Sequence, residues 1–129
     1  MERLIGYHAG VQLLTTVDQV PAEGLRFSYF DGPFEEQGLL FRLADGTVRA
    51  FKNECRHLPM RLDDRQGEGL WSADRSELVC AAHGARYRPS DGLCTAGPCR
   101  GSHLRKLPLV VHHGEVFLDT TKLGGFFAV

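Results

Sequence analysis

The sequence predicts an all-β protein built from short antiparallel strands. Fifteen glycines and six prolines are spread along the 129 residues, as expected where tight turns separate many strands. Two stretches, 39–51 and 107–120, each carry apolar residues on both sides of a turn signal. Evidence for helices is weak. The length suits one domain spanning 1–129, because domains most often have about 100–150 residues.

The first elements expected are a short turn and a strand. Residues 15–24, TTVDQVPAEG, can form at most about one helical turn because Pro21 and Gly24 interrupt them. Residues 25–30, LRFSYF, favour a strand through their aromatic content.

Two β-hairpins are expected further along the chain. In residues 39–51, LLFRLADGTVRAF, Asp45-Gly46 separates two apolar segments, and an Asp-Gly pair in this position is a strong hairpin signal. Residues 107–120, LPLVVHHGEVFLDT, repeat the pattern with His113-Gly114 near the turn. Both segments therefore favour antiparallel pairing.

The charge balance argues against nucleic acid and membrane partners. Fifteen basic and sixteen acidic residues give a net charge of −1, which provides no electrostatic footprint for a polyanion or an anionic membrane. No segment approaches the roughly 18 apolar residues of a membrane span. The N-terminal stretch MERLIGYHAGVQLL lacks the apolar run of a signal peptide. A cytoplasmic location is the expectation.

The middle of the chain, residues 55–99, is expected to form long loops that carry the function. It contains Cys55-x-His57 and, after 22 intervening residues, Cys80-x-x-His83. In a reduced compartment cysteines bind metal more often than they form disulfides. Two cysteines and two histidines at these short spacings predict a four-ligand metal site.

The distribution of the four ligands favours one metal centre over another. Two sulfur and two nitrogen ligands suit either tetrahedral zinc or an iron–sulfur cluster in which imidazoles replace two thiolates. Zinc fingers commonly place both cysteines in one pair and both histidines in the other. Here each pair holds one of each, which favours a two-iron cluster with one thiolate and one imidazole from each loop. Zinc remains the alternative.

These motifs resemble those of the Rieske iron–sulfur family. The residues that carry the resemblance are CRH (55–57), CAAHG (80–84), Tyr87, Asp91-Gly92 and the glycine- and proline-rich AGPCRG (96–101). The resemblance implies a Rieske-type fold, an antiparallel β-sandwich of three small sheets with a cluster-binding subdomain at about 53–101. It also implies one [2Fe–2S] cluster per chain, with Cys55 and Cys80 on the inner iron and His57 and His83 on the outer iron.

The reduction potential is expected in the lower or middle part of the Rieske window of roughly −150 to +300 mV. Hydrogen bonds to the ligand sulfurs raise the potential, because they stabilise the additional negative charge of the reduced state. Ala85 stands where high-potential members carry a serine, so its side chain cannot donate such a bond. Tyr87 can donate one if its hydroxyl reaches the sulfur of Cys55 or Cys80.

The resemblance implies one-electron transfer by a ferredoxin-like carrier, not an enzyme. Its expected partners are a flavin-containing reductase and a terminal redox enzyme such as an oxygenase. The sequence shows no serine–histidine–acid pattern, no phosphate-binding glycine loop and no nicotinamide or flavin fingerprint, and the chain ends too soon for the mononuclear iron domain of an oxygenase. The alternatives are a small Rieske subunit of a larger oxidoreductase, similar to nitrite reductase, and a zinc-binding structural module.

The roles of Cys94 and Cys99 stay open. The two residues form a Cys-x-x-x-x-Cys pair that could supply buried or reversibly oxidised thiols, a local disulfide, or part of a second site. The loop disulfide of respiratory Rieske proteins does not carry over, because its cysteines sit beside the ligand motifs, where this chain has Pro59–Met60 and Ala81–Ala82. Buried or reversibly oxidised thiols are the preferred interpretation.

Overall fold

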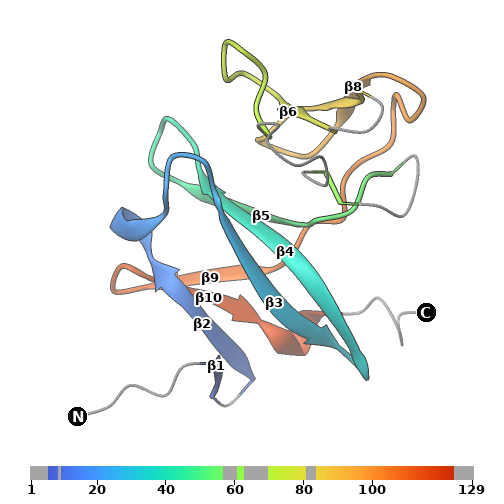
Figure 1. Ribbon diagram of the computed structural model, residues 1–129. Coiled ribbons are helices and arrows are strands. Elements are labelled where there is room, and N and C mark those ends of the chain that lie inside the picture. The colour runs from blue at the N-terminus through green and yellow to red at the C-terminus, as the bar shows by residue number, and fades with distance from the viewer. Residues whose placement is uncertain (1–5, 9, 57–60, 63–69, 81–83, 124–129) are drawn as a thin grey trace. The chain divides into compact units, whose positions relative to one another are not determined.

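The computed structural model describes residues 6–8, 10–56, 61–62, 70–80 and 84–123. By internal contacts the chain divides into two compact units (Figure 1). Unit 1 comprises Met1–Ala50 and Leu107–Val129, and unit 2 comprises Phe51–Lys106. Whether 1–129 behaves as a single domain stays a prediction.

Unit 1 contains two antiparallel sheets, apart from the last two residues of one strand, Phe51 and Lys52, which belong to unit 2. The first has the order β1-β2-β10-β9 and the second the order β3-β4-β5. Their strands are β1 (Gly6–His8), β2 (Val11–Thr16), β3 (Leu25–Asp31), β4 (Phe34–Arg42), β5 (Val48–Lys52), β9 (Leu109–His112) and β10 (Glu115–Asp119). Two short 3-10 turns, η1 (Val17–Gln19) and η2 (Thr120–Lys122), are the only helical elements among the described residues.

Both predicted hairpins are confirmed. Between β4 and β5 the Leu43 N–H donates to the Thr47 carbonyl at 2.7 Å, and Gly46 takes the positive φ of +90° that its turn requires. Between β9 and β10 both His113 and Gly114 have positive φ, as in a type I′ turn. The strand expected at 25–30 is β3.

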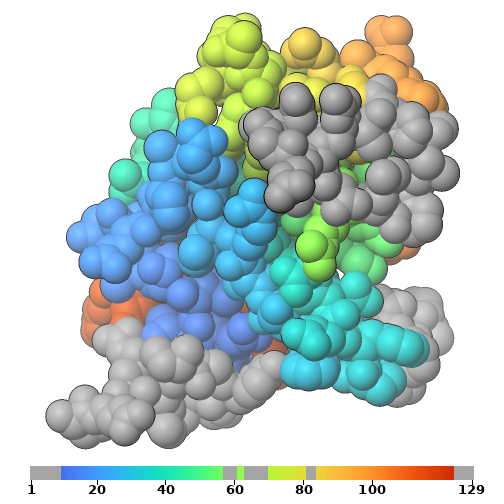
Figure 2. Space-filling view, viewed as in Figure 1, coloured from blue at the N-terminus to red at the C-terminus, as the bar shows by residue number. Residues whose placement is uncertain are grey.

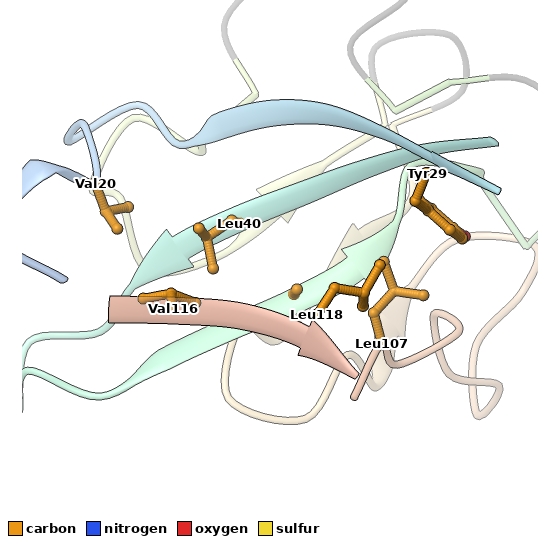
Figure 3. Close-up of a cluster of buried hydrophobic side chains, with 7 residues drawn as sticks. Val20, Tyr29, Leu40, Leu107, Val116 and Leu118 are labelled. Carbon is orange, nitrogen blue, oxygen red and sulfur yellow. The ribbon is translucent and has the colours of Figure 1, made fainter. Parts of the chain in front are cut away.

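The core of unit 1 is formed by buried side chains from both sheets (Figure 3). Tyr29 and Leu40 come from the β3-β4-β5 sheet, while Val116 and Leu118 come from β10. The remaining buried members are Val20, Ala50 and Leu107. Burial of such side chains contributes about 1.5–3 kcal/mol each, so this cluster joins the two sheets into a sandwich.

Strand β4 is central in its sheet and is buried on both faces over Gly38–Phe41. A central strand of this kind is apolar at successive positions rather than at alternating ones, which explains the run Leu39-Leu40-Phe41. Exposed side chains flank the β3–β4 turn: Phe30, near the end of β3, is 49% exposed and Phe34, at the start of β4, is 50% exposed. Figure 2 shows the surface of this hairpin in blue to cyan.

Unit 2 contains the third sheet, in the order β6-β7-β8. Its strands are β6 (Leu78–Val79), β7 (Arg86–Tyr87) and β8 (Cys94–Ala96). The expectation that residues 55–99 form loops throughout is therefore wrong for these three segments, which are too short to show periodicity. The all-β fold with three small antiparallel sheets is confirmed. No helix among the described residues is long and apolar enough to cross a membrane.

Candidate metal centre

Cys55 lies in the loop that follows β5 and is 3% exposed. The loop is fixed from both sides. The Glu54 N–H donates to the Lys52 carbonyl at 2.8 Å, and the buried side chain of Asn53 accepts a hydrogen bond from the Leu62 N–H at 2.9 Å. These bonds place the Cys55 thiol in the interior of unit 2.

Cys80 follows β6 directly and is fully buried. Its N–H donates to the Ala85 carbonyl at 2.7 Å, and its carbonyl accepts from the Gly84 N–H at 2.8 Å. Gly84 has a φ of +72°, a conformation that glycine adopts without the steric cost of a Cβ. These two bonds hold the backbone of Cys80 against Gly84 and Ala85, directly before β7 begins.

The two predicted histidine ligands, His57 and His83, lie outside the described residues. Within the described part of the chain no three His, Cys, Asp or Glu side chains gather as a metal site. What the structure places are the two predicted cysteine ligands, Cys55 and Cys80, each buried at the start of a loop that contains one of these histidines in sequence.

Tyr87 on β7 is fully buried and connects several of these elements. Its hydroxyl oxygen lies 3.3 Å from the Sγ of Cys55 and accepts a hydrogen bond from the Arg56 N–H at 3.0 Å. The sequence left open whether Tyr87 reaches Cys55 or Cys80, and the structure shows a hydrogen bond to Cys55. Burial, followed by the contacts with Cys55 and Cys99, raises the pKa of the Tyr87 hydroxyl well above its usual range. The hydroxyl therefore keeps its proton at neutral pH.

Ala85 is fully buried and, as expected, brings no hydroxyl to the site. It lies against the turn after β8, where a Cβ built on Gly97 would come within 3.0 Å of the Ala85 Cα. Close packing of these two backbones leaves little space for a larger side chain at either position.

Cys94 is the first residue of β8, and Cys99 lies in the turn that follows this strand. The Cys94 N–H donates to the Ser102 carbonyl at 2.7 Å, and the Gly101 N–H donates back to the Cys94 carbonyl at 3.0 Å. The Cys99 carbonyl accepts from both the N–H and the hydroxyl of Ser102, at 2.9 and 2.6 Å. These bonds bring the two sulfur atoms to 2.7 Å from each other.

The sulfur of Cys99 also lies 3.1 Å from the hydroxyl oxygen of Tyr87. Sequence reasoning did not find this contact, although the Cys-x-x-x-x-Cys spacing around Gly97-Pro98 indicated a turn that could bring the two thiols together. Burial and the neighbouring Cys99 raise the pKa of the Cys94 thiol to about 12. Tyr87 thus stands between a predicted cluster ligand and a pair of cysteines with no assigned role.

Charged and hydroxyl groups hold the third sheet together around this site. Glu77, just before β6, pairs with Arg86 at 3.3 Å and accepts a hydrogen bond from the Thr95 hydroxyl at 2.6 Å. In the β7–β8 turn Arg88 and Asp91 form a two-point contact at 2.9 and 2.6 Å. Planar contacts of this type fix orientation as well as position, so they hold β7, and with it Tyr87, in register.

Comparison with known proteins gives one family and a set of similar structures. Residues 11–117 match the family model of the Rieske [2Fe-2S] domain. A search of curated proteins found no match. The ferredoxin of carbazole 1,9a-dioxygenase from Nocardioides aromaticivorans IC177 is a similar solved structure, with 28% identity, a TM-score of 0.61, and coverage of 83% of this chain and 96% of that chain.

Two further structures share the fold at lower identity. A chain in the complex of reduced oxygenase and oxidized ferredoxin of carbazole 1,9a-dioxygenase is 17% identical, with a TM-score of 0.67 and coverage of 88% of this chain and 95% of that chain. The terminal oxygenase of carbazole 1,9a-dioxygenase from Novosphingobium sp. KA1 is 23% identical, with a TM-score of 0.67. There the match covers 88% of this chain and 30% of the oxygenase chain.

Proposed function

The chain belongs to the Rieske [2Fe-2S] domain family, and from this we propose that it is a one-electron carrier whose cluster is held by Cys55, His57, Cys80 and His83. The family binds a [2Fe–2S] cluster. Family membership does not by itself assign ligands, so the four residues are part of the proposal. The observation that carries it is the burial of the two motif thiols, Cys55 and Cys80, at the starts of two separate loops.

The donor chemistry of these residues fits the cluster. Iron–sulfur clusters take thiolate ligands, and in Rieske centres two imidazoles replace two thiolates on one iron. Each of the two loops offers one buried cysteine together with one histidine two or three residues later. A buried thiolate without a metal or other positive partner would be costly, and coordination removes that cost.

The surrounding residues act on the ligand sulfur. When bound, the cluster supplies reversible one-electron chemistry in the window that mixed histidine and cysteine ligation gives. Tyr87, kept protonated by burial, can donate its hydroxyl proton to the Cys55 sulfur, while the Arg56 N–H fixes the position of the hydroxyl oxygen. A single side-chain donor, with Ala85 in place of a second one, is the basis for a potential in the lower or middle part of the window.

The proposed partners are a flavin-containing reductase that supplies the electron and a terminal oxygenase that receives it. The similarity to a dioxygenase ferredoxin over 96% of that chain supports the carrier role, and structures of complexes between oxygenase and ferredoxin share the fold. On this proposal the protein is a component of an oxygenase system and performs no substrate chemistry itself. A cytoplasmic location belongs to the same proposal.

The test is analysis of the purified protein for iron, acid-labile sulfide and zinc. We expect a reddish-brown protein with two irons and two sulfides per chain, as a [2Fe–2S] cluster requires. His83→Ala should lose the colour, whereas the control His112→Ala, on strand β9 of unit 1, should keep it. Colourless protein that contains zinc and no sulfide would establish the zinc module instead.

A second measurement separates the carrier from a permanent subunit of a larger oxidoreductase. The carrier should elute as a monomer from gel filtration. A flavin-dependent reductase should reduce it with one electron per cluster. Stable co-purification with a large catalytic subunit would favour the alternative.

A further inference from the structure

We propose that Cys94 and Cys99 form a reversible dithiol–disulfide site, and that its oxidation state controls the hydrogen bond between Tyr87 and Cys55. The first part concerns only the two cysteines. The second part rests on the proposed function, because it acts through a ligand of the proposed cluster.

The turn between the two cysteines is already arranged for a disulfide. Their sulfur atoms are 2.7 Å apart, so little movement separates them from the bond length of about 2.05 Å. The carbonyl of Cys94 is held by Gly101 and that of Cys99 by Ser102, which fixes both backbones on either side of the bond. Closing the ring leaves this hydrogen-bond pattern in place.

The two thiols differ in access, and this sets the order of the chemistry. Cys99 is partly exposed, between the exposed Pro98 and Arg100, whereas Cys94 is 1% exposed. Burial raises the pKa of Cys94 to about 12, so the Cys94 thiol holds its proton until its neighbour has reacted. Cys99 is therefore the attacking residue and Cys94 the resolving residue.

The oxidant that fits this arrangement is a small disulfide such as oxidised glutathione. The Cys99 thiolate attacks one sulfur of the oxidant, a mixed disulfide forms, and the first thiolate leaves. Cys94 then loses its proton and attacks the Cys99 sulfur, which releases the second thiolate. Two protein thiols are oxidised to one disulfide, the oxidant is reduced to two thiols, and the two protons pass to the departing thiolates.

The state of Cys99 changes what Tyr87 can do. The phenol has one proton to donate and an oxygen that can accept two hydrogen bonds. With Cys99 as a thiol, its S–H can donate to the Tyr87 oxygen at 3.1 Å, the Arg56 N–H takes the other acceptor site, and the phenolic proton points to Cys55. Donation to the oxygen polarises the hydroxyl and strengthens the bond it gives.

Oxidation reverses this arrangement. As a disulfide, Cys99 has no proton and its sulfur can only accept. It then competes with Cys55 for the single phenolic proton, and the donor that strengthened the hydroxyl is lost. The weaker hydrogen bond to Cys55 stabilises the reduced cluster less, so the potential should fall when the pair is oxidised.

The experiment uses the full chain with its cluster, equilibrated in glutathione buffers from fully reducing to fully oxidising. Samples are acid-quenched, alkylated after denaturation and digested with trypsin. The peptide of residues 87–100, YRPSDGLCTAGPCR, contains both cysteines, so its mass reports the disulfide directly. The midpoint potential of the cluster is measured on the same samples. Cys99→Ser removes the thiol that attacks the oxidant but keeps a hydroxyl donor beside Tyr87, and Tyr87→Phe removes the link to Cys55.

We expect the peptide to convert from two alkylated cysteines to an internal disulfide as the buffer becomes oxidising, and the potential to fall in parallel. Neither change should occur in Cys99→Ser, which lacks the attacking thiol, and Tyr87→Phe should form the disulfide without the shift in potential. A peptide that stays doubly alkylated in the most oxidising buffer overturns the disulfide site. A disulfide that forms with no shift, or an equal shift in Cys99→Ser, overturns the coupling. Because the peptide mass is readable without a cluster, failure of the proposed function is recognised separately, by missing iron.

Discussion

The Oδ1 atom of Asn53 accepts a 2.9 Å hydrogen bond from the backbone N–H of Leu62, and both residues are buried. This bond joins the two ends of the segment that contains the first cysteine and histidine of the proposed site. The position of Cys55 therefore depends on an amide that carries no cluster chemistry of its own.

Replacing this amide should weaken both the fold and the retention of the cluster. Asn53→Ala leaves the Leu62 N–H buried without its acceptor, which costs about 1–3 kcal/mol. We expect a lower thermal midpoint and faster loss of iron to a chelator. The control is Gln37→Ala, which removes an amide whose partner is the Ser28 hydroxyl in an exposed bond. Equal iron loss in both variants would contradict the role given to Asn53.

Tyr87→Phe tests the hydrogen bond to the ligand sulfur. The ring stays buried while the donor to Cys55 is removed, so the reduced state loses stabilisation and the potential should fall. If the reduced state loses about 1.4 kcal/mol of stabilisation, the equilibrium constant for reduction falls tenfold, which lowers the potential by about 59 mV for a one-electron couple. Tyr29→Phe, in the core of unit 1, makes the same chemical change and should leave the potential unaltered. A higher potential in Tyr87→Phe would contradict the direction of the effect.

Two glycines of the β8 turn separate backbone strain from steric contact. Both have positive φ, +100° at Gly97 and +94° at Gly101, but a Cβ meets the Ala85 backbone at 3.0 Å in the first case and nothing within 4 Å in the second. Gly101→Ala should lower the free energy of unfolding by about 1–2 kcal/mol, the cost of the left-handed conformation. Gly97→Ala should lower it by about 1–3 kcal/mol more, because of overpacking against Ala85. Chemical denaturation measures both. Similar costs would show that the turn yields at Ala85.

The sandwich core of unit 1 is tested at β10. Leu118 is fully buried among the side chains of both sheets, so Leu118→Ala should lower the free energy of unfolding by about 2–5 kcal/mol. Val110, on the neighbouring strand β9, is 41% exposed. Val110→Ala should therefore change the free energy of unfolding by no more than about 0.5 kcal/mol. Comparable losses at the two positions would argue against the core described above.

Asp74 gives the fold a defined acid sensitivity. It accepts hydrogen bonds from the side chain and N–H of Ser76 and from the Ser72 hydroxyl, which lower the pKa of its carboxyl from 3.8 to about 2. Because the folded pKa lies below the unfolded one, its stabilisation is complete above the unfolded value and is lost as the pH falls through about 2. The thermal midpoint of Asp74→Asn should lie below that of the original protein by a constant amount at neutral pH, and the gap should close in acid. A gap that widens in acid would contradict this assignment.

Local signals in the sequence were sufficient for the hairpins of unit 1. Asp45-Gly46 and His113-Gly114 determine their turns through residues that tolerate positive φ, so no distant contact is needed to predict them. The short strands of the third sheet were different. Leu78–Val79 and Arg86–Tyr87 have two residues each, too few for periodicity, and exist because they pair with one another and with β8.

The candidate site was predictable to the level of its residue types and spacing. Two Cys–His pairs predict a metal site whose ligands stay a prediction, and the match over residues 11–117 establishes the family. That Tyr87 contacts Cys55 rather than Cys80 depends on a tertiary contact across 32 positions, which spacing cannot decide. The approach of Cys99 to the same hydroxyl likewise follows from the path of the glycine-rich turn.

Unit 2 begins and ends at neighbouring backbone positions. Phe51 bridges to Lys106, the Lys52 N–H donates to the Arg105 carbonyl at 2.8 Å, and in unit 1 the Leu107 N–H donates to the Ala50 carbonyl at 2.9 Å. The chain therefore leaves unit 1 after Ala50 and re-enters it at Leu107, two residues joined by a backbone hydrogen bond. Segments whose ends meet in this way tolerate insertion and exchange. During evolution, the segment Phe51–Lys106 can therefore change in length or sequence without altering the strand order of unit 1.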